Sequence, residues 1–229
     1  VGRQIAFSLD SPASRAEHSL THDKPRFAFF QVFQPRGGGK RQAPTFDVIA
    51  PGVAKHEEEI VLAPGAEPAA DPNLVLRVAV AAAEFGLPIA PGTLRNLKKC
   101  PIGDRNWTDE SRELFIRLLA SGPALLNVWE DIDFIDVPGK LIPEWLGVRN
   151  RPSASAAHRY TIDRHMVEVV TRLGRETPSG GRYDDRHYEA LLLAGILHDI
   201  GKRPGVANHA AEGARHATVV VERCWYASI

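Results

Sequence analysis

The pattern of apolar and polar residues predicts that the chain is mainly helical. From Asp71 and Pro72, which suit the start of a helix, apolar residues recur three and four positions apart as far as Gly86. A glycine there suits the end of a helix, because it accepts the left-handed backbone conformation common at that point. The apolar positions of this first predicted helix are Leu74, Val75, Val78, Ala82 and Phe85.

Three more helices are expected in the middle of the chain, over residues 93–99, 108–120 and 123–132. The second begins at Thr108, whose hydroxyl can accept a hydrogen bond from a free backbone N–H of the first turn. Their apolar stripes are typical of a packed core, and nothing in this part has the spacing of a catalytic group. We interpret residues 73–140 as a helical linker bundle.

The first part of the chain follows a different pattern. Residues 1–72 hold much of the glycine and proline, and apolar residues alternate only in short pieces such as Phe27 to Phe33 and Ile60 to Leu62. These pieces predict short strands and loops, which we interpret as the tail of a preceding domain. Because the only methionine lies deep in the chain and the C-terminus follows an apolar helical pattern without a stop signal, both ends are expected to be cuts in a longer protein.

One histidine is expected on the apolar face of a helix in the last third of the chain. Thr161 suits the N-cap of a helix that reaches about Leu173. On this helix Ile162, His165 and Val169 share a face, because they are three and four residues apart. His165 is therefore expected to point toward the core, where a histidine is either hydrogen-bonded or a metal ligand.

A second helix is expected over residues 187–200, with two strong metal ligands at its end. Its unbroken apolar run, residues 190–197, predicts that the helix is buried on all sides. His198 and Asp199 follow the run directly, and Gly201 is expected to cap the helix. Burying ionisable side chains beside so many apolar residues is costly unless a cation or hydrogen bonds compensate.

Together His165, His198 and Asp199 form a set of three metal ligands that come from two helices. Neutral imidazoles and a carboxylate suit manganese, iron or zinc, and magnesium less well, and the sequence does not choose among them. Lys202 follows the set by one turn, where it either complements the negative end of the helix or serves the chemistry. The pattern predicts a divalent metal site.

Composition narrows the functional classes. Lys plus Arg and Asp plus Glu both number 28, so the formal net charge is zero and nothing indicates a nucleic-acid or membrane-surface partner. The chain has no run of about 18 apolar residues and no signal-peptide pattern at its start. Cys100 and Cys224 lie far apart, which suits two buried thiols in a reducing compartment. We therefore expect a folded cytoplasmic protein.

The residues around the predicted ligands carry a family resemblance. The HDxxK pattern occurs as HDIGK at 198–202, and the upstream segment HRYTIDRH at 158–165 ends in a further histidine. With these two segments the chain resembles the HD superfamily of metal-dependent phosphohydrolases. With PEW at 143–145 and VRNRP at 148–152 as well, it is similar to the bifunctional uridylyl-transferring and uridylyl-removing enzymes of the PII nitrogen-signalling protein, in their high-GC bacterial form, from about Val48 onward.

The resemblance implies an enzyme with several domains of different function, of which this chain contains only some. In the family, an N-terminal nucleotidyltransferase domain attaches a nucleotide to a tyrosine of PII, the HD domain removes it, and C-terminal ACT domains sense glutamine. Neither the transferase signature nor an ACT-like portion occurs here. The resemblance therefore implies a mainly α protein in which a connector over 141–157 joins the linker bundle to a partial HD-type all-α domain over 158–229.

The resemblance also implies the roles of the site residues. A divalent ion held by His165, His198 and Asp199 would polarise a phosphoryl oxygen and activate a water for attack on the phosphodiester. Asp199 and Lys202 are the candidate catalytic residues, because the lysine could neutralise charge that develops on the phosphoryl group. The implied partners are the PII protein and UMP or AMP as the departing nucleotide.

Two departures from the family pattern bear on the site. The family usually shows Asp-His-Ser after the HD motif, whereas residues 208–210 read Asn-His-Ala, and His209 is kept as a candidate ligand or phosphate contact. The superfamily's last ligand is an aspartate, and no aspartate follows Asp199. The site is therefore expected to be incomplete and the chain by itself inactive. Glu212 or Glu222 could replace the aspartate only from an unfavourable position.

Two other interpretations stay open at this point. The chain could be a different HD-type phosphohydrolase that acts on a free nucleotide. It could also be a non-catalytic helical regulatory module, in which the metal site serves only to hold the fold together.

Overall fold

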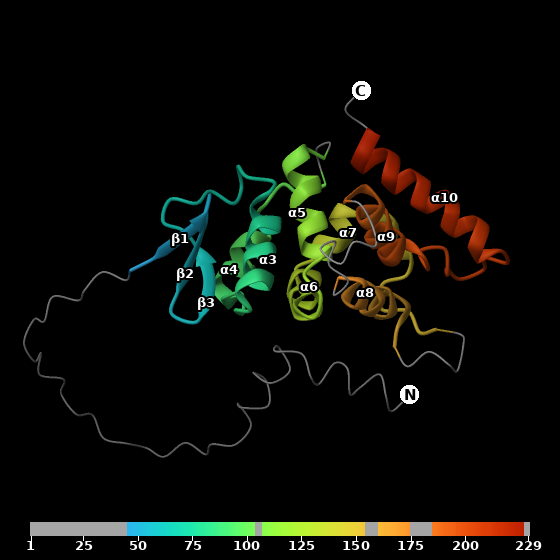
Figure 1. Ribbon diagram of the computed structural model, residues 1–229, viewed down its shortest axis with the longest axis horizontal. Coiled ribbons are helices and arrows are strands. Elements are labelled where there is room, and N and C mark those ends of the chain that lie inside the picture. Colours follow the sequence, from blue (N-terminus) through green and yellow to red (C-terminus); the bar gives the residue numbers. More distant parts are fainter. Residues whose placement is uncertain (1–44, 104–106, 154–159, 175–184, 227–229) are drawn as a thin grey trace, which may run out of the picture. The chain divides into compact units, whose positions relative to one another are not determined.

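The computed structural model describes residues 45–103, 107–153, 160–174 and 185–226. Within these ranges the chain is mainly helical, with a small antiparallel sheet near the start (Figure 1). The fold class predicted from the sequence is confirmed. The strand piece expected from Phe27 to Phe33 lies outside the described residues.

The sheet contains three short strands, β1 (Asp47–Ala50), β2 (Val53–His56) and β3 (Glu59–Leu62), in that order. Neighbouring strands pair antiparallel. The predicted piece from Ile60 to Leu62 lies in β3. Ile60 is fully buried and forms an isolated bridge with Ile89, so the third strand is joined to the chain segment that follows the first long helix.

Helix α3 (Leu74–Phe85) is the most buried element described, and it contacts strands β2 and β3 and two later helices. It ends as predicted at Gly86, which has a φ of +64°. The predicted start was wrong by two residues, because Asn73 is the N-cap. Asp71 instead accepts a hydrogen bond from the backbone N–H of Asn73 and pairs with the Arg77 guanidinium at 2.6 Å.

The three helices predicted after α3 are all present, shifted by one or two residues. They are α4 (Pro91–Leu97), α5 (Asp109–Leu119) and α6 (Ala124–Phe134). Thr108 caps α5 as predicted, since its Oγ1 accepts from the backbone N–H of Ser111 at 3.1 Å and the Ser111 hydroxyl lies 3.3 Å from the backbone N–H of Thr108.

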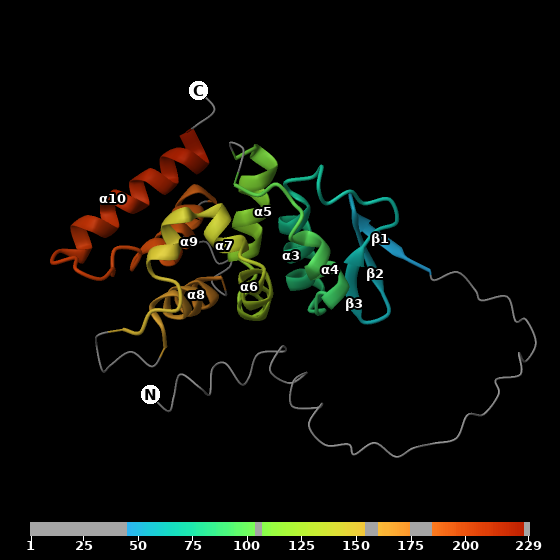
Figure 2. The same cartoon turned by 180° about the vertical axis from the view of Figure 1, so that it is seen from behind.

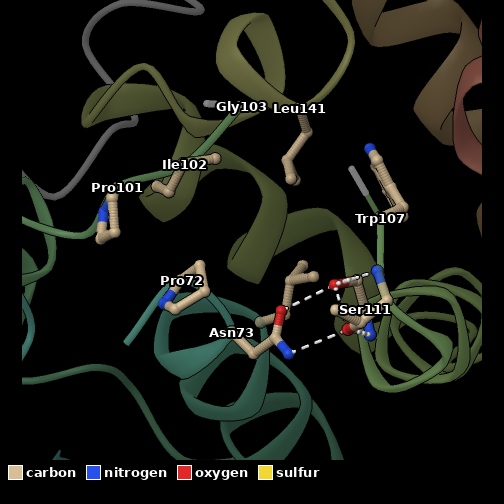
Figure 3. A pocket seen from close by; sticks show the side chains of 10 residues that line it. Pro72, Asn73, Pro101, Ile102, Gly103, Trp107, Ser111 and Leu141 are labelled. Atoms are coloured by element: carbon tan, nitrogen blue, oxygen red, sulfur yellow. Dashed lines mark hydrogen bonds between the residues drawn. The ribbon is translucent and has the colours of Figure 1, made fainter. Parts of the chain in front are cut away.

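A buried asparagine ties α3 to the start of α5. The Asn73 amide donates to the Thr108 hydroxyl at 3.2 Å and to the Glu110 carboxylate at 2.8 Å, and its oxygen accepts from the Ser111 hydroxyl at 2.7 Å. Figure 3 shows the part of this network that joins Asn73, Thr108 and Ser111, at the wall of a hollow of about 100 Å³. Because its members satisfy one another, the network is structural. The other walls include Pro101, Ile102, Gly103, Trp107 and Leu141.

The segment predicted as a connector is packed into the core. After α7 (Val137–Leu141), a 3₁₀ helix, η1 (Pro143–Gly147), carries Trp145, whose side chain is 1% exposed. Its ring lies edge-on to Trp129 of α6, with ring centroids 5.3 Å apart. A large aromatic side chain gains much from burial, so this part of the connector is anchored.

The last described part consists of α8 (Ile162–Leu173), α9 (Asp185–Leu197), α10 (His209–Val221) and a π-helical turn, η3 (Glu222–Tyr226). Helix α8 packs on both α9 and α6, and α9 also contacts α5, as the two opposite views in Figures 1 and 2 show. One cluster of buried apolar residues extends from the sheet to η3. Among the described helices, none combines the length and apolar character needed to cross a membrane.

Helix α9 is not buried on all sides, so that prediction was wrong. Leu192, Ile196 and Leu197 are buried, whereas Ala190 and Ala194 are exposed. The apolar run is longer than the face that α8 and α5 cover. The residues left in solvent are small alanines, whose exposure costs little.

Buried polar contacts hold the end of the described chain. Arg223 in η3 pairs with Glu144 in η1 at 2.7 Å. Burial raises the pKa of Glu144, but the hydrogen bonds and positive charge of Arg223, together with a backbone hydrogen bond, outweigh this effect, so its pKa lies below the ordinary value. The two cysteines are buried thiols, as predicted, and burial raises the pKa of Cys100 to about 11 and of Cys224 to about 12.

The cap of α5 gives a stability prediction. Thr108→Ala removes the oxygen that accepts from Ser111 and Asn73, so it should lower the free energy of unfolding by about 1 kcal/mol, measured by urea denaturation. Thr108→Ser keeps this oxygen and should cost much less. An equal loss in both variants would mean that the threonine methyl group, and not the cap, matters.

Candidate metal centre

The three predicted ligands come together at one point. His165 lies in the first turn of α8, and His198 and Asp199 lie in the turn that directly follows α9. One ligand atom from each residue lies within 4.8 Å of the other two. The sequence places these residues in two separate segments, and the packing of α8 on α9 joins them.

The geometry directs both imidazoles toward a single carboxylate oxygen. Nε2 of His198 lies 3.4 Å from Oδ2 of Asp199, and Nε2 of His165 lies 3.9 Å from the same oxygen. The two rings meet edge to face, with centroids 5.2 Å apart. Two imidazole nitrogens and one carboxylate oxygen form a donor set that suits a transition metal or zinc.

The second nitrogen of His198 shows which atom is available to a metal. Nδ1 lies 2.8 Å from the backbone carbonyl oxygen of Gly195. A carbonyl oxygen only accepts, so Nδ1 carries the hydrogen and, in a neutral ring, Nε2 carries a lone pair. This lone pair faces the Asp199 carboxylate, an arrangement that a cation between the two atoms would stabilise. The site therefore fits a metal ion.

Lys202 lies beside the same carboxylate. Its Nζ is 2.8 Å from Oδ2 of Asp199, and the two side chains are 28% and 12% exposed. Lys202 therefore neutralises the carboxylate directly, in addition to any effect on the end of α9. Gly201 is not the residue that caps the helix in a left-handed conformation, because its φ is not positive and the chain between α9 and Lys202 forms a turn.

The prediction that His165 points into the core was wrong, because its side chain is 27% exposed. Ile162 is buried as predicted, but further along α8 the buried positions are Met166 and Val170, each one residue after the predicted His165 and Val169. His165 therefore lies at the edge of the core, where solvent can reach its side chain.

The orientation of α8 is fixed by polar contacts beside the candidate ligand. Arg164 pairs with Glu130 on α6 and with Glu168 on its own helix. Burial raises the pKa of Glu130 despite this cation. Asp163 accepts a hydrogen bond from the backbone N–H of Asn150 at 2.7 Å, which ties α8 to the connector.

His209 and the two candidate glutamates are not part of the three-residue group. His209 is the first residue of α10 and is exposed. Glu212 pairs with Arg215 and lies 2.8 Å from Nε2 of His216, and Glu222 is exposed. The role of His209 as a ligand or phosphate contact stays a prediction.

Sequence reasoning missed the contact between Gly195 and the candidate ligand His198. Gly195 received no role because it stood inside a long apolar run. The available signal was its position, three residues before His198 in a helix, since a lone glycine within a helix often has a packing or functional reason.

Comparisons with known proteins match most of the chain. It is 39% identical over 191 residues to a bifunctional uridylyltransferase/uridylyl-removing enzyme of Streptomyces coelicolor. The aligned region covers 82% of this chain and 22% of that protein. Proteins of the same name match from Mycobacterium tuberculosis, at 38% identity over 75% of this chain and 21% of that protein, and from Corynebacterium glutamicum, at 34% identity over 58% and 18%.

The chain thus spans about a fifth of the length of the curated relatives that it matches. No family model matches it. No solved structure matches it either. The identity to these actinobacterial relatives, over most of the chain, shows its family. The chain belongs to the family of bifunctional uridylyltransferase/uridylyl-removing enzymes.

Proposed function

We propose that His165, His198 and Asp199 hold a divalent metal ion, and that in the full-length enzyme this ion belongs to a site that hydrolyses the phosphodiester between a nucleotide and a tyrosine of the PII protein. The observation that carries the proposal is the convergence of both Nε2 atoms on one oxygen of Asp199. The name of the relatives, which includes uridylyl removal, supports the reaction class. The assignment of residues 158–229 to an HD-type domain is also part of this proposal, as are the other domain boundaries given in the sequence analysis.

The ion, which could be manganese, iron, zinc or magnesium, would supply Lewis acidity and activate a water for attack. The chain's own residues have separate tasks. Asp199 supplies the negative charge of the donor set, and the Gly195 carbonyl directs the His198 lone pair to the same point. Lys202 places a second positive charge there, where charge develops on a phosphoryl group during attack.

The proposed reaction separates UMP or AMP from PII. A partly exposed site suits a protein substrate, because the tyrosine and its nucleotide have to reach the metal together. The side chains of His165 and His198 are 27% and 35% exposed, so the candidate ligands are accessible. Transfer of the nucleotide and glutamine sensing are not assigned to residues of this chain.

Metal binding gives the first test of the proposal. His198→Ala should weaken Mn²⁺ binding by about tenfold or more, because losses of this size follow even from changes to groups that only orient ligands. Isothermal titration calorimetry of the 229-residue chain measures the affinity. His56→Ala is the matched control and should leave the affinity unchanged, since this histidine lies in strand β2, outside the group. Equal affinity of His198→Ala and wild type would exclude the site.

Turnover gives the second test. The described residues bring three protein ligands together, and only Asp199 among them carries charge, so the ion should be held loosely and the attacking water poorly fixed. We expect negligible release of nucleotide from modified PII by residues 1–229, measured by chromatography of the released nucleotide. The full-length Streptomyces coelicolor relative serves as the positive control.

A panel of free nucleotides, assayed in parallel, separates PII from a small-molecule substrate. Hydrolysis of free nucleotides alone would favour the different HD-type phosphohydrolase considered in the sequence analysis. Rapid hydrolysis of modified PII by the 229-residue chain, abolished by Asp199→Ala, would show instead that the site is already complete.

A further inference from the structure

The turn that carries His198 and Asp199 lies between two close contacts, and a glycine forms each of them. Gly195 in α9 faces α8, which supplies His165. Gly201, two residues after Asp199, faces the first turns of α10. Both glycines are buried.

At Gly195 the absence of a side chain lets α9 approach α8. A Cβ atom built there would lie 2.8 Å from Cδ1 of Leu173 and 3.1 Å from Cγ2 of Val170. The end of the half-buried Leu173 side chain can rotate away, but Val170 is fully buried and its branched side chain is stiff in a helix. A larger residue would therefore move α9 away from α8.

This contact sets the distance between the candidate ligands. Val169, one turn after His165, lies 3.8 Å from the Cβ position of Gly195, and His198 lies one turn after Gly195. The two helices therefore run in opposite directions, and a shift at Gly195 passes directly to the pair of histidines. The carbonyl of Gly195 also accepts from Nδ1 of His198, so one residue controls both spacing and ring orientation.

The contact at Gly201 is tighter, because its neighbours are backbone atoms. A Cβ atom there would collide with the carbonyl oxygen of His209 and the backbone nitrogen of Gly213, and would lie 2.6 Å from Cα of Gly213. Backbone atoms of a helix cannot rotate away as a side chain does. Any side chain at Gly201 would therefore displace α10 or the turn that holds Asp199 and Lys202.

We propose that Gly195 and Gly201 are positioning residues for the metal, which hold the His198–Asp199 turn against α8 on one side and α10 on the other. The inference rests on the proposed metal site. Helix propensity alone predicts the opposite behaviour at Gly195, since replacing a glycine by alanine inside a helix usually stabilises the helix.

The test compares Gly195→Ala and Gly201→Ala in the 229-residue chain, with Mn²⁺ affinity measured by calorimetry. Both variants should bind about tenfold more weakly or worse, the range seen when groups that orient metal ligands are changed. The loss should be larger for Gly201→Ala, whose clash is with backbone. Adding Leu173→Ala to Gly195→Ala should restore part of the affinity, because it removes the nearest obstructing atom.

Two matched controls separate positioning from general damage. A Cβ at Gly213, on the other side of the same contact, would meet only ordinary distances of 3.5 Å and more, and one at Gly92 in α4 would meet only the Arg95 side chain at 3.7 Å. Gly213→Ala and Gly92→Ala should therefore keep wild-type affinity. Thermal unfolding identifies variants that do not fold, and if Gly201→Ala is among them, the milder Gly195→Ala variant decides.

NMR of histidine rings provides a readout that does not depend on the metal. In the wild type, nuclear Overhauser contacts should link the rings of His165 and His198, and ¹⁵N shifts should place the hydrogen of His198 on Nδ1. Both signatures should weaken in folded Gly195→Ala. If the wild type binds no Mn²⁺, the proposed function fails. In that case the ring contacts still test the positioning inference, and unchanged contacts in Gly195→Ala would overturn it. If the wild type binds and both alanine variants bind equally well, only the positioning inference fails.

Discussion

The close packing of α8 on α9 is the contact on which the candidate site depends. Each helix alone supplies only part of the donor set, His165 from one and the His198–Asp199 pair from the turn after the other. A single imidazole or carboxylate at the edge of a core indicates no chemistry by itself. Three such side chains directed at one point define a chemical environment, and helix packing creates that point.

The rest of the described structure supports this contact from several sides. Helix α6 holds α8 through the ion pair between Arg164 and Glu130, and α5 contacts α9. Helix α3 packs on α5 and α6 and on the sheet, and one continuous cluster of buried residues joins all of them. Because protein interiors are close-packed, a displacement in the bundle would reach the candidate ligands through stiff contacts.

The sequence predicted the helices well, because their apolar spacing and caps are local signals. Thr108 and Gly86 lie at the expected helix boundaries, and the three candidate ligands come together. The burial of individual side chains was predicted less well. On α8, Ile162 is buried as predicted, but Met166 and Val170 are the buried residues where His165 and Val169 were expected.

The packing of Trp145 into the core and the close contact of Gly195 with α8 also escaped prediction. In both cases the decisive contact involves a partner distant in sequence, Trp129 for the tryptophan and Val170 for the glycine. Periodicity describes which face of an element is apolar. It contains no information on which other element will cover that face, or how closely.

Because its ligands come from two helices, a bound ion would act as a cross-link between segments that are distant in the chain. Its departure would then require either the separation of α8 from the turn after α9 or the loss of one ligand at a time. By mass action, the ion and the packed pair of helices would stabilise each other, so the occupancy of the metal and the local opening of this part of the protein become two measures of one equilibrium.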